Sequence, residues 1–168
     1  DKQIAQVMEK LEERSASTSL LEVNREKYEL LRNGVDVDIL DDKGRKSSKK
    51  ALLLDFNNVG NNSFLAVQEL KISGPIYNRR TDIIGFINGI PLVFIELKRA
   101  DVDIYNAYID NLRDYEKFIP QLFYYNAFLL LGNGKNAKVG TLESKFAFFH
   151  EWKRLAETDA GKVALKIA

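Results

Sequence analysis

Two acidic residues and a lysine at the open end of a predicted β-hairpin are the residues of this chain best suited to chemistry. Asp82 opens the first apolar run, Glu96 and Lys98 close the second, and Asn88-Gly89 separates the two runs. Asn-Gly between β-branched and aromatic residues is the strongest short-range hairpin signal. A hairpin brings the ends of its strands together, so we expect the two carboxylates and the ammonium group to converge.

Two carboxylates beside an ammonium group fit a metal-dependent hydrolytic site. Carboxylate oxygens suit a hard cation such as Mg²⁺, which polarises a phosphoryl oxygen and lowers the pKa of a bound water. The lysine can orient that water or stabilise developing charge. Spacing alone leaves another interpretation open, in which Glu96 and Lys98 form a pair at a strand end and Asp82 is a turn or capping residue.

The register of the hairpin sets a geometric condition for a shared site. A two-residue loop pairs Asp82 with Ile95, so Asp82 and Glu96 point to opposite faces, because side chains alternate along a strand. The hydrolytic interpretation therefore requires a bulge, a three-residue loop or a sharp twist. Glycine and proline in strands often mark bulges. The expected places are Gly85, Gly89 and Pro91.

Composition excludes several other kinds of site. The chain has 168 residues with a hydrophobic fraction of 45%, enough for one domain with its own core. It has no cysteine and one histidine, His150, which excludes thiol catalysis, Cys-based zinc sites, His triads and multi-His metal sites within this chain. No run is long enough to span a membrane, and we expect a cytoplasmic protein without a membrane partner. The net charge of +1 gives no preference for nucleic acid, so any basic surface must be local.

The first half of the chain reads as helices followed by a meander of strands. Periodicity predicts a helix over 2–13, a small-polar break over 15–19 and a second helix that ends at Asn33-Gly34, which Asn24 could split as a fresh N-cap. Strands are predicted over 35–39, 51–56 and 63–70. The turn over 41–50 fits either a solvated hairpin tip or a loop that contacts phosphate. Its basic residues are Lys43, Arg45, Lys46, Lys49 and Lys50.

The second half indicates a crossover between two strands. A helix is predicted over 104–117, with Asp101 or Asp103 as its N-cap, and strands over 124–131 and 137–142. A helix between the strand ending at Lys98 and the next strand favours a parallel pair. The predicted fold class is therefore α/β, with a mixed β-sheet flanked by helices. The apolar spacing of Phe146, Phe149, Trp152 and Leu155 predicts a final amphipathic helix.

The ordered motifs of the hairpin resemble a known nuclease core. Arg80-x-Asp82, followed by Asn88-Gly89-x-Pro91-Leu92 and Glu96-x-Lys98, is similar to the PD-(D/E)xK nuclease superfamily. More narrowly, the chain resembles the N-terminal nuclease domain of the type I restriction enzyme R subunit, over roughly 20–155. The segments outside the hairpin that carry this resemblance are Asn24-Arg25, Gly34-Val35, Asp55-Phe56, 61–64, 119–123, Tyr125-Asn126, Gly140-Thr141 and Trp152-Lys153.

The resemblance implies a restriction-endonuclease-like fold and roles for individual residues. Asp82 and Glu96 would be metal ligands with the Leu97 carbonyl as a third oxygen, and Lys98 would position or activate water for Mg²⁺-dependent hydrolysis of DNA. Asn111 and Tyr115 match the family's Gln-x-x-x-Tyr motif, with a shorter amide in place of glutamine. A further glutamate on an early helix would come from Glu22, Glu26 or Glu29. Arg79 and Arg80 would contact the DNA backbone, or form a salt bridge to a carboxylate such as Glu69.

The resemblance also implies an organisation and partners. The chain would be a single nuclease domain from a larger subunit, with an N-terminal helix and break over 1–19, a nuclease core over 20–155 and the start of a linker to a motor domain over 156–168. No phosphate-binding loop motif occurs, so ATP belongs only to the absent motor. The expected partners are double-stranded DNA and the methylation and specificity subunits. The alternatives are a non-catalytic module of nuclease fold that binds DNA or a partner subunit, and a repair nuclease of the same fold.

Overall fold

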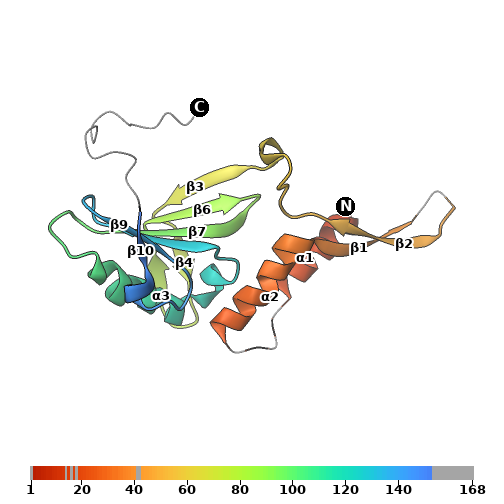
Figure 1. Cartoon of the computed structure of the whole chain (residues 1–168). Coiled ribbons are helices and arrows are strands. Elements are labelled where there is room, and N and C mark those ends of the chain that lie inside the picture. Colours follow the sequence, from red (N-terminus) through yellow and green to blue (C-terminus); the bar gives the residue numbers. More distant parts are fainter. Residues whose placement is uncertain (1, 14, 16, 18, 41–42, 153–168) are drawn as a thin grey trace.

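A computed structural model describes residues 2–13, 15, 17, 19–40 and 43–152 (Figure 1). The fold is α/β, as the sequence predicts, and is built on a six-stranded mixed sheet consistent with a restriction-endonuclease-like core. The sheet has the order β10-β9-β8-β7-β6-β3. Within the described part of the chain, no helix is long and apolar enough to cross a membrane.

The sheet is antiparallel except for one central pair. Strands β7 and β8 run parallel, from Val93 beside Phe128 to Leu97 beside Gly132, so the predicted crossover is confirmed. The strands of this sheet are β3 (Phe64–Gln68), β6 (Ile83–Ile87), β7 (Ile90–Leu97), β8 (Phe128–Gly132), β9 (Ala137–Gly140) and β10 (His150–Glu151). A small hairpin of β4 (Lys71–Ser73) and β5 (Asn78–Arg80) leads into β6.

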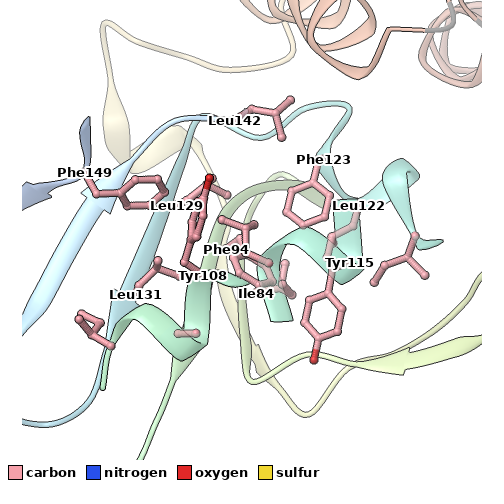
Figure 2. Close-up of a cluster of buried hydrophobic side chains, with 14 residues drawn as sticks. Ile84, Phe94, Tyr108, Tyr115, Leu122, Phe123, Leu129, Leu131, Leu142 and Phe149 are labelled. Atoms are coloured by element: carbon pink, nitrogen blue, oxygen red, sulfur yellow. The ribbon is translucent and has the colours of Figure 1, made fainter. Parts of the chain in front are cut away.

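The helical crossover packs its apolar side on one face of the sheet to make the main core. It begins after Asp103, whose side chain accepts from the Tyr105 N–H, and it contains a π-helical segment (Ala107–Leu112) followed by α3 (Arg113–Phe118). The centre of the predicted helix is thus π rather than α. A 3-10 turn (Pro120–Phe123) then leads towards β8. Figure 2 shows how Phe94, Leu129 and Phe123 fill the space between the sheet and this segment.

A second core joins the N-terminal segment to the far end of the central hairpin. Helices α1 (Lys2–Glu12) and α2 (Leu20–Asn33) precede the two-stranded arm of β1 (Val35–Leu40) and β2 (Lys46–Ala51), which extends away from the sheet (Figure 1). Ser19 caps α2, and the helix is continuous through Asn24. The members of this core are Leu31, Val35, Val37, Leu53, Leu54, Ile90 and Leu92.

Two polar side chains of α2 fasten this second core. The Asn24 amide donates to the carbonyls of Phe123, Tyr124 and Asn126 at 2.9–3.2 Å. The Lys27 ammonium is buried and donates to the carbonyls of Leu11 and Glu13, at 2.9 and 2.7 Å, at the end of α1. Burial lowers the pKa of Lys27, and these carbonyls, which α1 itself leaves unpaired, are its hydrogen-bond partners.

Three predicted elements are wrong in the structure. Residues 46–51 form a strand rather than part of a turn, because they pair with β1, and only the first residue of the predicted strand 51–56 is in a strand. The predicted final helix is a 3-10 turn (Phe146–Phe148) followed by β10, because Phe149 is buried against the main core and β10 pairs with β9. Leu155 and residues 156–168 lie outside the described residues.

The Asn88-Gly89 turn is held from outside the hairpin. Both residues have left-handed backbone conformations, with φ values of 51° and 81°, as a two-residue turn of this type requires. The Asn88 side chain accepts from the Ser63 N–H at 2.8 Å and donates to the Leu53 carbonyl and the Asn62 side chain, both at 2.9 Å. One side chain therefore ties the turn to the 53–63 loop.

We expect Asn88→Ala to lower the free energy of unfolding by about 2–3 kcal/mol. The substitution removes these hydrogen bonds, and alanine tolerates a positive φ less well than asparagine does. Asn88→Gly keeps the backbone conformation and isolates the hydrogen-bond contribution. Urea unfolding followed by circular dichroism measures both. Asn57→Ala, at an exposed position of the adjacent loop, is the control, and an equal loss in that variant would contradict the assignment.

Candidate active site

A β-bulge in the central hairpin shifts its register by one residue, which is the irregularity that Asp82 and Glu96 need to come into phase. Phe86 pairs with Pro91 but Gly85 pairs with Val93, so β7 carries one extra residue at this point. Beyond the bulge Ile83 pairs with Ile95, so the same register, continued by one residue, would set Asp82 opposite Glu96. The predicted irregularity is thus confirmed at two of the expected positions. A β-carbon on Gly85 would lie 3.0 Å from that of Val93, which explains a glycine here.

Asp82 is held by the strand that follows the turn. Its Oδ2 accepts a hydrogen bond from the Leu97 N–H at 2.7 Å, which fixes the carboxylate beside the end of β7. The Asp82 carbonyl accepts from the Glu69 N–H at 2.9 Å. The Asp82 carboxylate is therefore positioned by a backbone N–H rather than by a flexible side chain, and the Asp82 backbone is held by Glu69.

Glu96 is buried in a charged environment. It is 2% exposed, and burial together with the nearby Asp82 carboxylate raises its pKa to about 8, against the opposing effect of Lys98. Its Oε1 lies 3.5 Å from the Lys98 Nζ. Its Oε2 is buried and has no hydrogen-bond partner. An unpaired buried carboxylate oxygen is uncommon in folded proteins and requires an explanation.

Lys98 is placed by a chain of hydrogen bonds from the crossover helix. Its ammonium donates to the Asn111 Oδ1, the Asn111 amide donates to the Tyr115 hydroxyl at 3.3 Å, and that hydroxyl donates to the Arg80 carbonyl at 2.9 Å. Burial raises the pKa of Tyr115, so the phenol stays a donor. The chain links the lysine to the backbone just before Asp82.

The helix that carries Asn111 has an unusual backbone at this point. Asn111 lies in the π-helical segment and Tyr115 in α3, one turn later. Single π-turns inside helices occur frequently at functional sites. Although asparagine is shorter than the glutamine of the Gln-x-x-x-Tyr motif, the Asn111 side chain reaches Lys98, and the Tyr115 hydroxyl reaches the Arg80 carbonyl.

The two arginines before the hairpin differ in their surroundings. The Arg79 guanidinium pairs with the Asp114 carboxylate, with one N–O distance of 3.1 Å, and lies over the rings of Tyr77 and Phe118 at 5.1 and 4.9 Å. Arg80 is exposed, and its Nη1 lies 3.3 Å from the Glu69 Oε1. This is the salt bridge predicted from the sequence as the alternative to a DNA contact. Arg79 thus fastens the β4–β5 hairpin to α3, while Arg80 remains on the surface.

Other candidate residues lie apart from this site. Among the early-helix glutamates, Glu22 contacts the Ser17 hydroxyl and Glu29 accepts from the Asn33 side chain. In the described ranges, no three His, Cys, Asp or Glu side chains form a metal-binding group. The acidic side chains at the site are Asp82 and Glu96.

Sequence reasoning missed how the site is tied to the neighbouring parallel strand. The Lys98 N–H donates to the Gly132 carbonyl at 2.7 Å, which extends the β7–β8 ladder through the lysine. The one available signal was the predicted parallel pairing, without its register.

Comparison with known proteins identifies the family of the chain. Residues 1–148 match the model of the type I restriction enzyme R protein N terminus. The chain belongs to this family. It is 38% identical over 138 residues to the HindI endonuclease subunit of a type I restriction enzyme from Haemophilus influenzae, which covers 80% of this chain and 13% of that protein. It is 31% identical over 140 residues to a provisionally named type I endonuclease subunit, MjaIXP, from Methanocaldococcus jannaschii, covering 79% of this chain.

The chain covers a small part of the length of the relatives that it matches. It spans 13% of the length of each of these two relatives. The R-protein N terminus is thus the part of the subunit described here. Asp82, Glu96, Lys98, Asn111 and Tyr115 all fall inside the matched residues.

The burial of Glu96 makes the stability of the metal-free domain depend on pH. The folded-state pKa of about 8 lies above the unfolded value of about 4.5, so the folded state retains a proton that the unfolded state releases. Stability should therefore be highest below pH 4.5 with respect to this group, and fall between pH 4.5 and 8 by up to roughly 1.4 kcal/mol per unit.

Glu96→Gln removes this titration. We expect a flatter profile of unfolding free energy against pH for the variant in EDTA, measured by urea unfolding between pH 5 and 8.5. Glu9→Gln, at an exposed position of α1, is the matched control and should keep the wild-type slope. A slope equal in wild type and Glu96→Gln would show that Glu96 titrates normally.

Proposed function

We propose that this chain is a metal-dependent endonuclease domain of the R subunit, and that it hydrolyses DNA phosphodiester bonds. The juxtaposition that carries this proposal is Asp82, Glu96 and Lys98 at one end of the bulged hairpin. Leu97 N–H holds Asp82 at 2.7 Å, and Lys98 lies 3.5 Å from Glu96. The relatives are named endonuclease subunits, which favours a cleaving domain over a binding module.

The donor set suits Mg²⁺. Asp82 and Glu96 would hold the ion together with the Leu97 carbonyl, and the unpartnered Glu96 Oε2 supports this assignment. All three are oxygen ligands, and Mg²⁺ keeps several waters in sites of this kind. When bound, Mg²⁺ polarises the phosphoryl oxygens and makes a water more acidic.

Lys98 would orient the attacking water and stabilise the negative charge that develops on the phosphate. Asn111 and Tyr115 are positioning residues, because they act on Lys98 and on the Arg80 backbone. In the hydrolysis, the water oxygen forms a bond to phosphorus, one P–O ester bond breaks, and the water proton ends on the leaving sugar oxygen. Preorganised charges of this kind commonly supply several kcal/mol.

The rest of the subunit and its complex would supply what this domain lacks. We infer that ATP is used by a motor elsewhere in the polypeptide, and that methylation and specificity subunits direct the enzyme on double-stranded DNA in the cytoplasm. A near-neutral domain makes few phosphate contacts, so its own nonspecific affinity should be weak, on the order of 10⁻⁴–10⁻⁶ M at physiological salt. The isolated chain should cut slowly and without sequence preference.

Asp82→Asn and Lys98→Ala should each reduce nicking of supercoiled plasmid in Mg²⁺ by about 100-fold or more, because each removes a charge placed at the reacting phosphate. Agarose gels give the rate, and circular dichroism checks the fold. Asp110→Asn is the control, since Asp110 is an exposed acid on the same crossover segment. Full activity of a folded Asp82→Asn protein would refute the site, and rapid cutting at one defined sequence would refute the type I role.

Metal binding should release a proton below pH 8. Glu96, with its pKa of about 8, must lose its proton to become a ligand. Apparent Mn²⁺ affinity should therefore rise up to about tenfold per pH unit between pH 6 and 8 and then level off. Titration calorimetry in buffers of different ionisation enthalpy counts the proton directly. Binding without proton release at pH 7 would contradict the involvement of Glu96, and Glu96→Gln should abolish the pH dependence.

A further inference from the structure

Two loops flank the candidate site at the carboxyl ends of the parallel strands. Strand β7 ends at Leu97, beside Gly132 at the end of β8. The loops 98–104 and 133–136 therefore leave the sheet next to each other, at the carboxyl ends of these two strands. In α/β sheets, ligands bind outside the carboxyl ends of parallel strands. A nucleic acid bound at Lys98 would lie against both loops.

Hydrogen bonds fix the two loops to one another. Asn133 is 6% exposed, and its amide donates to the Val102 carbonyl in the other loop at 2.8 Å. Its Oδ1 accepts from the N–H groups of Lys135 and Asn136, at 3.2 and 2.9 Å. The Val102 N–H donates to the Arg99 carbonyl at 3.0 Å, which closes a turn in the first loop. This arrangement is a preorganised surface, so little ordering is required on binding.

Each loop presents a cation. Arg99 follows Lys98 directly, and its side chain is 82% exposed. Its guanidinium pairs with Asp101 at 2.8 and 3.0 Å, but such an exposed pair contributes about 0–1 kcal/mol, so a phosphate can replace the carboxylate. Lys135 is exposed at the tip of the second loop. Arg79 is held more firmly, because its guanidinium pairs with the part-buried Asp114 carboxylate and lies over two rings.

We propose that Arg99 and Lys135 bind the DNA backbone on either side of the phosphate that is cut. This inference rests on the proposed nuclease function and assigns the contacts that hold its substrate. The guanidinium matches two phosphate oxygens, and the ammonium acts as a point charge. The contacts carry no sequence information, in keeping with a domain that leaves recognition to other subunits.

The test measures binding of a labelled 30-base-pair duplex by fluorescence anisotropy, in a Lys98→Ala background so that the duplex stays intact. Arg99→Gln with Lys135→Gln should weaken binding about tenfold at low salt and reduce the slope of log affinity against log salt by about 1.8. The control is Lys46→Gln with Lys49→Gln, which removes two exposed lysines from the β2 arm. The control should leave affinity and slope unchanged.

Asp101→Asn supplies an effect of opposite sign. It releases Arg99 from its pair, so affinity should rise in the parent background, and the gain should shrink when Arg99→Gln is also present. In the native background with Mg²⁺, plasmid nicking should follow the same order as binding.

The outcomes separate this inference from the function on which it rests. Unchanged affinity and salt slope in the Arg99 and Lys135 variant, with a Lys98→Ala parent that binds the duplex and a wild-type chain that nicks plasmid, would overturn the inference alone. A larger loss in the Lys46 and Lys49 variant would also overturn it and place the DNA on the β1–β2 arm. A wild-type chain that neither binds nor nicks DNA in Mg²⁺ would overturn both proposals.

Discussion

One extra residue in β7 is the constraint on which the rest of the structure depends. A regular ladder would send Asp82 and Glu96 to opposite faces, and the shift between Gly85 and Phe86 brings them into phase. The same shift divides the apolar side chains of the strand. Phe94 enters the main core, whereas Ile90 and Leu92 enter the second core with the N-terminal helices. Packing on both sides therefore stabilises the bulge, because removing it would expose one set of side chains or bury the wrong one.

The burial of Glu96 costs the folded state free energy at the candidate site. A buried carboxylate whose Oε2 has no partner destabilises the metal-free protein when it is charged. Lys98 offsets part of this cost, whereas the Asp82 carboxylate adds to it. Both are held in place, Asp82 by the Leu97 N–H and Lys98 by Asn111 and the β8 ladder. Proteins commonly carry such locally unfavourable groups where chemistry requires them. The pairing of a raised pKa with fixed neighbours fits a site completed by a cation.

The sequence was a good guide wherever a short pattern controls the structure. The Asn88-Gly89 turn, the parallel crossover and the need for a bulge follow from local chemistry and side-chain alternation. The failures lie where distant contacts decide. Residues 46–51 are polar and basic yet form a strand because β1 pairs with them, and the aromatic spacing after Phe146 mimics a helix although Phe149 is drawn into the main core. The pairing of Arg79 with Asp114 joins residues that are 35 positions apart in the sequence, and no local sequence pattern predicts it.

Strand β7 belongs to both cores and to the site, and this has a mechanical consequence. Ile90 and Leu92 pack in the second core with the N-terminal helices, and Phe94 packs against the crossover. Glu96 lies near the other end of the same eight-residue strand. The packing of the N-terminal helices therefore acts on the same strand that carries Glu96. A truncation that removes these helices would therefore strip packing from the strand that carries the candidate site, at the end of the strand opposite to Glu96.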